Sequence, residues 1–141
     1  MNVILVALDA SPRAPKVLDA AIDLGRRTGA RLYLYRAVGL PAELPALALA
    51  RSPSEVAELM LGLARQELKA LEAIVPAELR AGSGASLAIP WQGVCEGAHA
   101  QHADLIMIGS HGYGGLDRLL GTTAAKIVNH SDVSVLVVKN R

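Results

Sequence analysis

The chain has 141 residues, of which 52% are hydrophobic and 19% are charged, and its formal net charge is +1. This composition is typical of a packed globular protein and excludes a disordered one, whose apolar content is too low to offset the entropy lost on ordering. So small a net charge creates no long-range field toward DNA or an anionic membrane, and the few aromatic residues leave few rings for stacking single-stranded bases.

The N-terminal part of the chain shows the pattern of a strand, a helix and a second strand. Residues 3 to 8 are apolar on both faces of any strand that they form, as in a parallel sheet covered on two sides. The pair Ser11-Pro12 predicts a helix start with Ser11 as the N-cap, and Gly29 predicts the helix end. Residues 32 to 38 have strand character. This succession predicts a βαβ unit.

The middle of the chain predicts a loop, a helix and a weak strand. Residues 39 to 53 carry three prolines among alanines and leucines, which is typical of a loop. The sequence Ser-Pro-Ser-Glu at 52 to 55 resembles a capping box and predicts a helix that runs to about Val75. We expect the apolar face of this helix to consist of Val56, Leu59, Met60 and Leu63. Residues 85 to 89 predict a weak third strand, ended by Pro90.

The C-terminal part continues the alternation of helices and strands. Residues 92 to 102 and 121 to 130 predict helices, and residues 104 to 108 and 133 to 138 predict strands. This order predicts an α/β fold: a single three-layer, doubly wound domain, with a five-stranded parallel sheet and helices on both faces. Ligands bind such sheets beyond the carboxyl ends of the strands, where the strand order reverses.

We expect residues 1 to 141 to form one domain that buries roughly 70% of the surface exposed by the unfolded chain. The single cysteine, Cys95, has no partner for a disulfide within the chain. The sequence shows neither a signal-peptide pattern nor an uninterrupted apolar stretch of about 18 residues that could span a bilayer. These features predict a soluble, cytoplasmic protein.

The glycine-rich segment after Ile108 is the strongest candidate for a binding site. Its glycines are Gly109, Gly112, Gly114, Gly115 and Gly121. A strand, a glycine loop and a helix predict an anion site, because the first turn of a helix has unpaired N–H groups and the positive end of the dipole. Glycines have no Cβ atom, so a phosphate can approach several amides at once.

Two better-known phosphate motifs are absent from this segment. The P-loop requires a lysine directly after its second glycine, whereas Thr122 follows Gly121. The dinucleotide motif follows the first strand of its fold, whereas these glycines follow the fourth predicted strand.

At these residues the sequence resembles the universal stress protein family, whose members are small α/β domains of adenine-nucleotide α-hydrolase-like topology. Nucleotide-binding members carry Gly-x2-Gly-x9-Gly-[Ser/Thr] after the fourth strand, and this chain has Gly109, Gly112, Gly121 and Thr122. The resemblance implies the strand order 3-2-1-4-5.

The resemblance extends over the full length of the chain. The sequence VALDAS at 6 to 11 is similar to the end of the family's first strand, ADLIMIGSHG at 103 to 112 to its signature, and SVLVVK at 134 to 139 to its last strand.

Three features depart from the family pattern, and all lie at the implied site. Eight residues separate Gly112 from Gly121 where the pattern has nine, so the glycine loop is one residue shorter. Ala10 stands where many members have glycine. Ala37 stands where a larger valine often covers the adenine.

The resemblance implies an adenine-nucleotide site for ATP, ADP or AMP. By position, the nucleotide-binding residues are Ala7, Leu8, Asp9, Ala37, Ile108, Gly109, His111, Gly112, Gly121, Thr122 and Thr123. Asp9 and the backbone near Ala7 and Ala37 would hold the adenine, and Gly121 with the two threonines would hold the phosphates. A Mg²⁺ or Mn²⁺ ion would be bound mostly by the phosphates, because the segment lacks paired carboxylates.

Simpler roles stay open for two of these residues. Asp9 is also explained as a turn residue before Ser11-Pro12, and the neighbours of His111 account for the segment without a role for its side chain. His99 and His102 have no evident third ligand, so we predict no protein metal site.

Three functions fit the sequence. The first is a stress-response regulatory protein that binds an adenine nucleotide, with slow or no hydrolysis, and passes its occupancy to a protein partner. The second is a dimeric interaction protein that does not bind nucleotides, and the third is a slow ATPase. We predict no catalytic residue, because no Walker-type lysine or positioned carboxylate is recognisable.

The last strand predicts the oligomeric state. Residues 134 to 138 would form an exposed apolar edge in a monomer, which is an aggregation hazard. The family covers this edge by pairing it with a second copy, so the resemblance implies a homodimer. Neither a nucleic acid nor a membrane is an expected partner.

Overall fold

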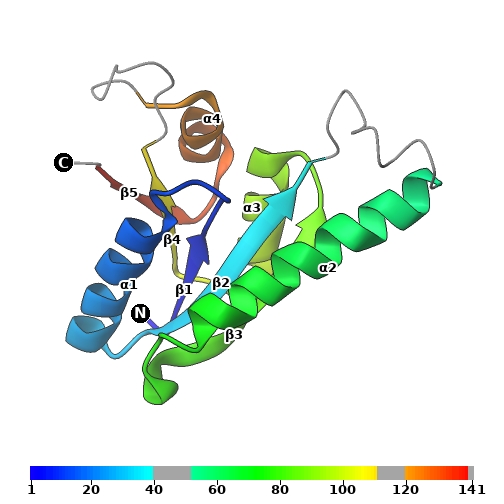
Figure 1. The fold of residues 1–141 in the computed structure, drawn as a ribbon. Coiled ribbons are helices and arrows are strands. Elements are labelled where there is room, and N and C mark those ends of the chain that lie inside the picture. Colours follow the sequence, from blue (N-terminus) through cyan, green and yellow to red (C-terminus); the bar gives the residue numbers. More distant parts are fainter. Residues whose placement is uncertain (40–51, 111–119, 140–141) are drawn as a thin grey trace.

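The structure is a computed structural model that describes residues 1–39, 52–110 and 120–139. Its strands form one parallel sheet in the order β3-β2-β1-β4-β5, as Figure 1 shows. The strands are β1 (Val3–Ala7), β2 (Arg31–Val38), β3 (Arg80–Leu87), β4 (Leu105–Gly109) and β5 (Ser134–Val138). The expected three-layer fold and its strand order are confirmed.

Helices cover both faces of this sheet. They are α1 (Ala14–Thr28), α2 (Pro53–Glu72), α3 (Pro90–Ala100) and α4 (Thr122–His130), with a 3-10 turn, η2 (Ala77–Leu79), before β3. Residues of α1 and α2 pack in one core cluster, and residues of α3 and α4 pack in the other. Among the described residues, no helix combines the length and the apolar composition needed to cross a bilayer.

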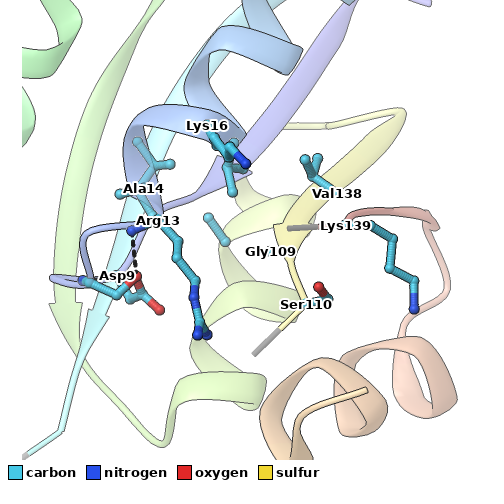
Figure 2. Close-up of a pocket in the computed structure, with 12 residues that line it drawn as sticks. Asp9, Arg13, Ala14, Lys16, Gly109, Ser110, Val138 and Lys139 are labelled. Carbon is cyan, nitrogen blue, oxygen red and sulfur yellow. Dashed lines mark hydrogen bonds between the residues drawn. The ribbon is translucent and has the colours of Figure 1, made fainter. Parts of the chain in front are cut away.

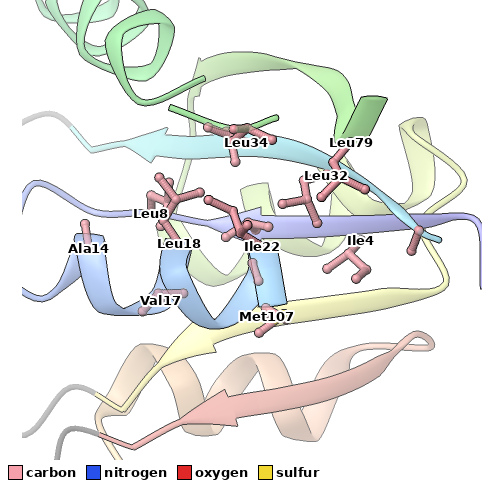
Figure 3. Close-up of a cluster of buried hydrophobic side chains, with 14 of the residues drawn as sticks. Ile4, Leu8, Ala14, Val17, Leu18, Ile22, Leu32, Leu34, Leu79 and Met107 are labelled. Carbon is pink, nitrogen blue, oxygen red and sulfur yellow. The ribbon is translucent and has the colours of Figure 1, made fainter. Parts of the chain in front are cut away.

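The two cores explain why the central strands are apolar on both faces. Ile4 and Val6 of β1 lie in the core beneath α1, and Leu5 lies in the core beneath α3 and α4. All three are fully buried. Figure 3 shows Leu18 and Ile22 of α1 within the first core. Each such side chain contributes roughly 1.5–3 kcal/mol through its burial.

The start of α1 differs from the expectation that Ser11 is its N-cap. The helix begins at Ala14, Arg13 occupies the N-cap position without a side-chain cap, and Pro15 lies in the first turn. Ser11 instead forms a local turn, because its Oγ accepts a hydrogen bond from the Arg13 N–H at 3.2 Å. The expected end is confirmed, since Gly29 has a φ of 77°, a conformation that favours glycine.

Helix α2 has the expected start but a different buried face. The Ser52 Oγ accepts a hydrogen bond from the Glu55 N–H at 3.3 Å, which confirms the cap. The helix ends at Glu72, before the expected Val75. The expectation that Leu59 and Leu63 belong to the buried face was wrong, because these residues are 51% and 54% exposed. The buried residues are Val56, Ala57, Leu61, Ala64 and Leu68.

Strand β3 and helix α3 both begin earlier than the sequence predicts. β3 begins at Arg80 rather than at residue 85, because it pairs along its length with β2 despite its glycines and serines. Gly82 has a φ of 122° beside a register shift at Leu32 and Tyr33. Pro90 is the first residue of α3 rather than only the end of a strand.

Candidate functional site

A pocket lies at the carboxyl ends of β1, β2 and β4, on the sheet face that α3 and α4 cover, with a cavity volume of about 90 Å³. Seven of the eleven predicted nucleotide-binding residues line it: Ala7, Leu8, Asp9, Ala37, Ile108, Gly109 and Thr123. Gly121 and Thr122 adjoin Thr123 at the start of α4. His111 and Gly112 lie outside the described residues, as do Gly114 and Gly115.

The walls of this pocket are mainly apolar. Val94 of α3, with Ala124 and Ile127 of α4, lines it from the helix layer, and Ile108 lines it from the sheet. Val94, Ala124 and Ile127 are each at most 4% exposed. The only carboxylate among the described lining residues is that of Asp9. An apolar slot with polar groups at one edge suits a flat heteroaromatic ring.

The Asp9 side chain forms a local turn at the edge of the pocket. Its Oδ1 accepts a hydrogen bond from the Ser11 N–H at 3.0 Å. This contact agrees with the interpretation of Asp9 as a turn residue. Asp9 also lines the pocket, so the two interpretations are compatible.

Arg36 connects three elements at this edge, although no sequence motif pointed to it. Its Nε donates a hydrogen bond to the Leu8 carbonyl at 3.0 Å, and its Nη2 donates to the Asp9 carbonyl at 3.2 Å. Its Nη1 bonds to the Glu67 carboxylate on α2. The planar guanidinium therefore fixes the backbone that follows β1. The sequence feature that could have identified Arg36 is that it is the single charged residue in an otherwise apolar predicted strand.

Tyr35 forms part of the pocket lining and was also missed. Its hydroxyl is hydrogen-bonded to Ser86 of β3, and burial raises the pKa of this hydroxyl. α3 lies close to this ring, because a Cβ atom at Gly93 would come within 2.8 Å of both the Tyr35 Oη and the Ala88 Cβ. Gly93 is thus needed for the close approach of α3 to β2.

The start of α4 presents backbone N–H groups beside the pocket. Gly121 is the N-cap residue, and no side chain caps the helix. Thr122 and Thr123 are exposed. Gly121 has a φ of −63°, which residues with side chains also adopt, so a left-handed conformation does not explain this glycine. Close packing explains the glycine at position 109, because a Cβ atom there would lie 3.2 Å from Val17 Cγ2.

Other candidate groups have structural explanations. Cys95 on α3 is partly buried, and burial, followed by the nearby charges of Asp132 and Glu96, raises the pKa of its thiol. The His99 Nε2 lies 3.4 Å from Asp132 Oδ2. Within residues 1–39, 52–110 and 120–139, no three His, Cys, Asp or Glu side chains form a group that could hold a metal ion.

Comparisons with known proteins give consistent results. The family model described as universal stress protein family matches residues 1–139. A universal stress protein of Synechocystis is 28% identical over 153 residues, which cover 97% of each chain. The structure of UspA from Lactobacillus plantarum has a TM-score of 0.79 and 23% identity, covering 98% of this chain and 97% of that one.

A second structure was determined with a bound nucleotide. It is the universal stress protein from Archaeoglobus fulgidus in complex with dAMP, with a TM-score of 0.62 and 21% identity. The match covers 99% of this chain and 98% of that chain. These likenesses extend over nearly all of both chains, so the same fold is present throughout.

Proposed function

Because this chain belongs to the universal stress protein family, we propose that it is a regulatory protein that binds an adenine nucleotide at the carboxyl edge of its sheet. The observation that carries this proposal is the pocket lined by seven of the residues that the resemblance selected. The complex of the Archaeoglobus relative with dAMP supports the same ligand class. Occupancy of the pocket would be passed to a protein partner in a stress response.

The chemistry of the lining suggests how the nucleotide would lie. The adenine would occupy the apolar slot between Ala37 of β2 and Ile108 of β4, with Val94 beneath it. The ribose would lie near Asp9 and Gly109. The phosphates would then face the start of α4, where uncapped N–H groups and the positive end of the helix dipole favour an anion.

The same lining supports binding with slow or no hydrolysis. Rapid hydrolysis needs a residue that positions and deprotonates water, and charged groups that stabilise the transition state. Asp9 is the one carboxylate that the described residues contribute to the pocket, and its Oδ1 already accepts the Ser11 N–H. A Mg²⁺ or Mn²⁺ ion would supply charge neutralisation, held chiefly by the phosphates with Asp9 nearby.

Thermal shift and calorimetric titration with ATP, ADP, AMP and adenosine test this proposal. We expect stabilisation of the wild-type protein and a loss of binding in Ala37→Phe, because the added ring would fill the slot. Ala70→Phe, at an exposed position of α2, is the matched control and should bind as the wild type does.

The other outcomes distinguish the alternative functions. No stabilisation at millimolar nucleotide would favour a dimeric interaction protein. Steady ADP release that Gly121→Val abolishes would favour a slow ATPase.

We also propose that the protein is a homodimer paired through β5. This strand lies at the edge of the sheet and pairs only with β4 among the described strands. Leu136 on it is 37% exposed. Light scattering coupled to size-exclusion chromatography should give twice the chain mass, and Val137→Pro should reduce it, because proline cannot donate to a strand pair. A mass of 14.7 kDa for the wild type would contradict the dimer.

A further inference from the structure

A trough lies beside β3, the strand that forms the edge of the sheet opposite β5 (Figure 1). Residues of β2, β3 and α3 line it. Its cavity volume is about 300 Å³, whereas the cavity beside Asp9 at the start of α1, shown in Figure 2, measures only about 20 Å³. Among the described residues, only Tyr35 lines both the trough and the candidate nucleotide pocket, so the trough is a separate feature of the surface.

The trough exists because a helix covers β3 on one face only. Helix α2 packs against β3, whereas α3 packs mainly against β2 and β1. The residues of β3 on the face away from α2 are Gly82, Gly84 and Ser86, which pair with β2 residues of the core beneath α3 and α4. No side chain of β3 longer than that of serine therefore lies on this face.

The outer edge of β3 presents backbone groups that no described strand pairs. Peptide groups alternate in direction along a strand, and the Ala88 N–H points toward β2, where it bonds to the Val38 carbonyl at 3.1 Å. The peptide groups of Ser83, Ala85 and Leu87 therefore point away from β2. Among the described strands, β3 pairs with β2 alone. An edge strand of eight residues without a proline is open to the addition of another strand.

The trough offers polar groups to one long side chain of an added strand. The Tyr33 hydroxyl lies directly above Gly84, because a Cβ atom at Gly84 would overlap it. Glu96 lines the trough from α3, and its side chain is the one charged group in the described lining. Burial, followed by the charge of Glu96, raises the pKa of the Tyr35 hydroxyl, which agrees with a carboxylate near the two rings. A carboxylate beside a tyrosine hydroxyl favours a basic side chain, and arginine offers several donors at once.

A second copy of β3 would not fill the trough. Residues 81 to 86 of this strand are all alanine, glycine or serine, so none of their side chains would reach Glu96. An added strand lies about 4.8 Å beyond β3, and only a long side chain can cross from there over Gly84. Arginine and lysine have both the length and the charge that this place requires.

We propose that the edge of β3 binds an extended segment of a protein partner as an added strand, with a basic side chain that crosses Gly84 to meet Glu96 and Tyr33. Main-chain hydrogen bonds to Ser83 and Ala85 would supply affinity, and the trough would supply selectivity for the basic residue. This surface lies at the edge that β5 does not use, and it does not depend on nucleotide binding.

Fluorescence anisotropy with labelled synthetic peptides tests this surface. The probe is the capped peptide Thr-Val-Thr-Arg-Thr-Val-Thr, and one counterpart has norleucine in place of arginine. Two further counterparts carry N-methyl groups on alternate residues, one on the threonines and one on the other three residues. The protein variants are Glu96→Gln and its control Glu58→Gln, at an exposed position of α2 that lines neither the trough nor the nucleotide pocket. Equal circular dichroism spectra show that both variants are folded.

We expect the arginine peptide to bind the wild type saturably and both Glu96→Gln and the norleucine replacement to weaken binding about three- to fivefold. Glu58→Gln should leave the affinity unchanged. The norleucine peptide should bind Glu96→Gln and the wild type equally, because the charge pair is then absent from both. At least one of the N-methylated peptides should lose binding, because its donors to the β3 edge are gone.

Three results would overturn the proposal. The first is the absence of saturable binding of the arginine peptide. The second is an equal response to Glu96→Gln and Glu58→Gln, or undiminished binding of both N-methylated peptides. The third is a Val137→Pro variant that stays dimeric in light scattering until the arginine peptide dissociates it, because a second copy would then occupy the edge of β3.

Discussion

Replacement of Arg36 by methionine tests whether this side chain holds the pocket edge in place. The variant keeps an apolar stem of similar length and removes the donors to the Leu8 and Asp9 carbonyls. It also removes the ion pair with Glu67. We expect the protein to become less stable, mainly because one carbonyl on the buried side of the edge loses its partner.

The magnitude follows from the exposure of each partner. Leu8 is 2% exposed, so an unpaired carbonyl there costs about 1–3 kcal/mol. Asp9 is exposed, and water can replace the lost donor at its carbonyl. The Glu67 side chain is 59% exposed, and such an ion pair contributes about 0–1 kcal/mol. The free energy of unfolding should fall by about 1–4 kcal/mol, which lowers Tm by roughly 4 °C per kcal/mol.

Urea unfolding followed by far-UV circular dichroism measures this change. Glu67→Gln is the control that removes only the ion pair and should cost less than about 1 kcal/mol. If Glu67→Gln costs as much as Arg36→Met, the stabilisation comes from the ion pair and the reasoning about Leu8 is wrong. An Arg36→Met variant with the wild-type urea midpoint would refute it as well.

Two further predictions concern packing and pH. In the same urea assay, Gly93→Ala should destabilise the protein by about 1–3 kcal/mol, because the new Cβ atom would overlap the Tyr35 hydroxyl. The control Gly62→Ala has open space around the new Cβ atom and should stabilise α2 by about 0.5–1 kcal/mol. The hydrogen bond that Ser83 donates, together with the nearby Lys69, lowers the pKa of Glu72. The ionised Glu72 side chain therefore stabilises the folded state above its unfolded-state pKa, and this contribution is lost as pH falls through the folded-state pKa. Ser83→Ala should therefore be less stable than the wild type at pH 7 and equally stable at strongly acid pH, and a difference independent of pH would contradict this assignment.

The strands that were predicted best are those whose residues have a clear apolar pattern and a strong intrinsic preference for strands. Residues 3 to 8 are apolar on both faces because both faces of β1 are buried. β3 was located only in part, because its sequence Arg-Ala-Gly-Ser-Gly-Ala-Ser-Leu has little intrinsic preference for a strand. Its extended conformation depends on pairing with β2, a contact between segments far apart in the chain.

The buried face of α2 shows a second limit of local patterns. The helix offers one apolar stripe with Leu59 and Leu63 and another with Leu61 and Leu68. Helical spacing alone permits either stripe to face the sheet. The position of α2 over β2 and β3 selects the second one, and this position is not encoded within the helix.

In the candidate site too, some residues were predicted from the sequence and others were found only in the structure. The family resemblance selected Ala37 and Ile108, because matching a sequence to a family also assigns each residue a position in the family's fold. Both residues line the pocket. Arg36 and Tyr35 were missed because their roles depend on which atoms of neighbouring strands and helices they meet. The contact between Arg36 and the Leu8 carbonyl becomes visible only when the register pairs Ala7 with Tyr35.

The position of the candidate pocket follows from one property of the topology. Helices α1 and α2, which connect β1 to β2 and β2 to β3, pack on one face of the sheet. Helices α3 and α4, which connect β3 to β4 and β4 to β5, pack on the other face. At the junction of β1 and β4, successive helices therefore leave toward opposite faces, and a crevice opens on each side of the same strand ends. The crevice on the side of α3 and α4 is the apolar pocket lined by Ala37 and Ile108. An adenine nucleotide would place its flat base there and its phosphates toward the start of α4. Selectivity for the base should then depend on lining residues such as Ala37, and selectivity for the number of phosphates should depend on Thr122 and Thr123 at the start of α4.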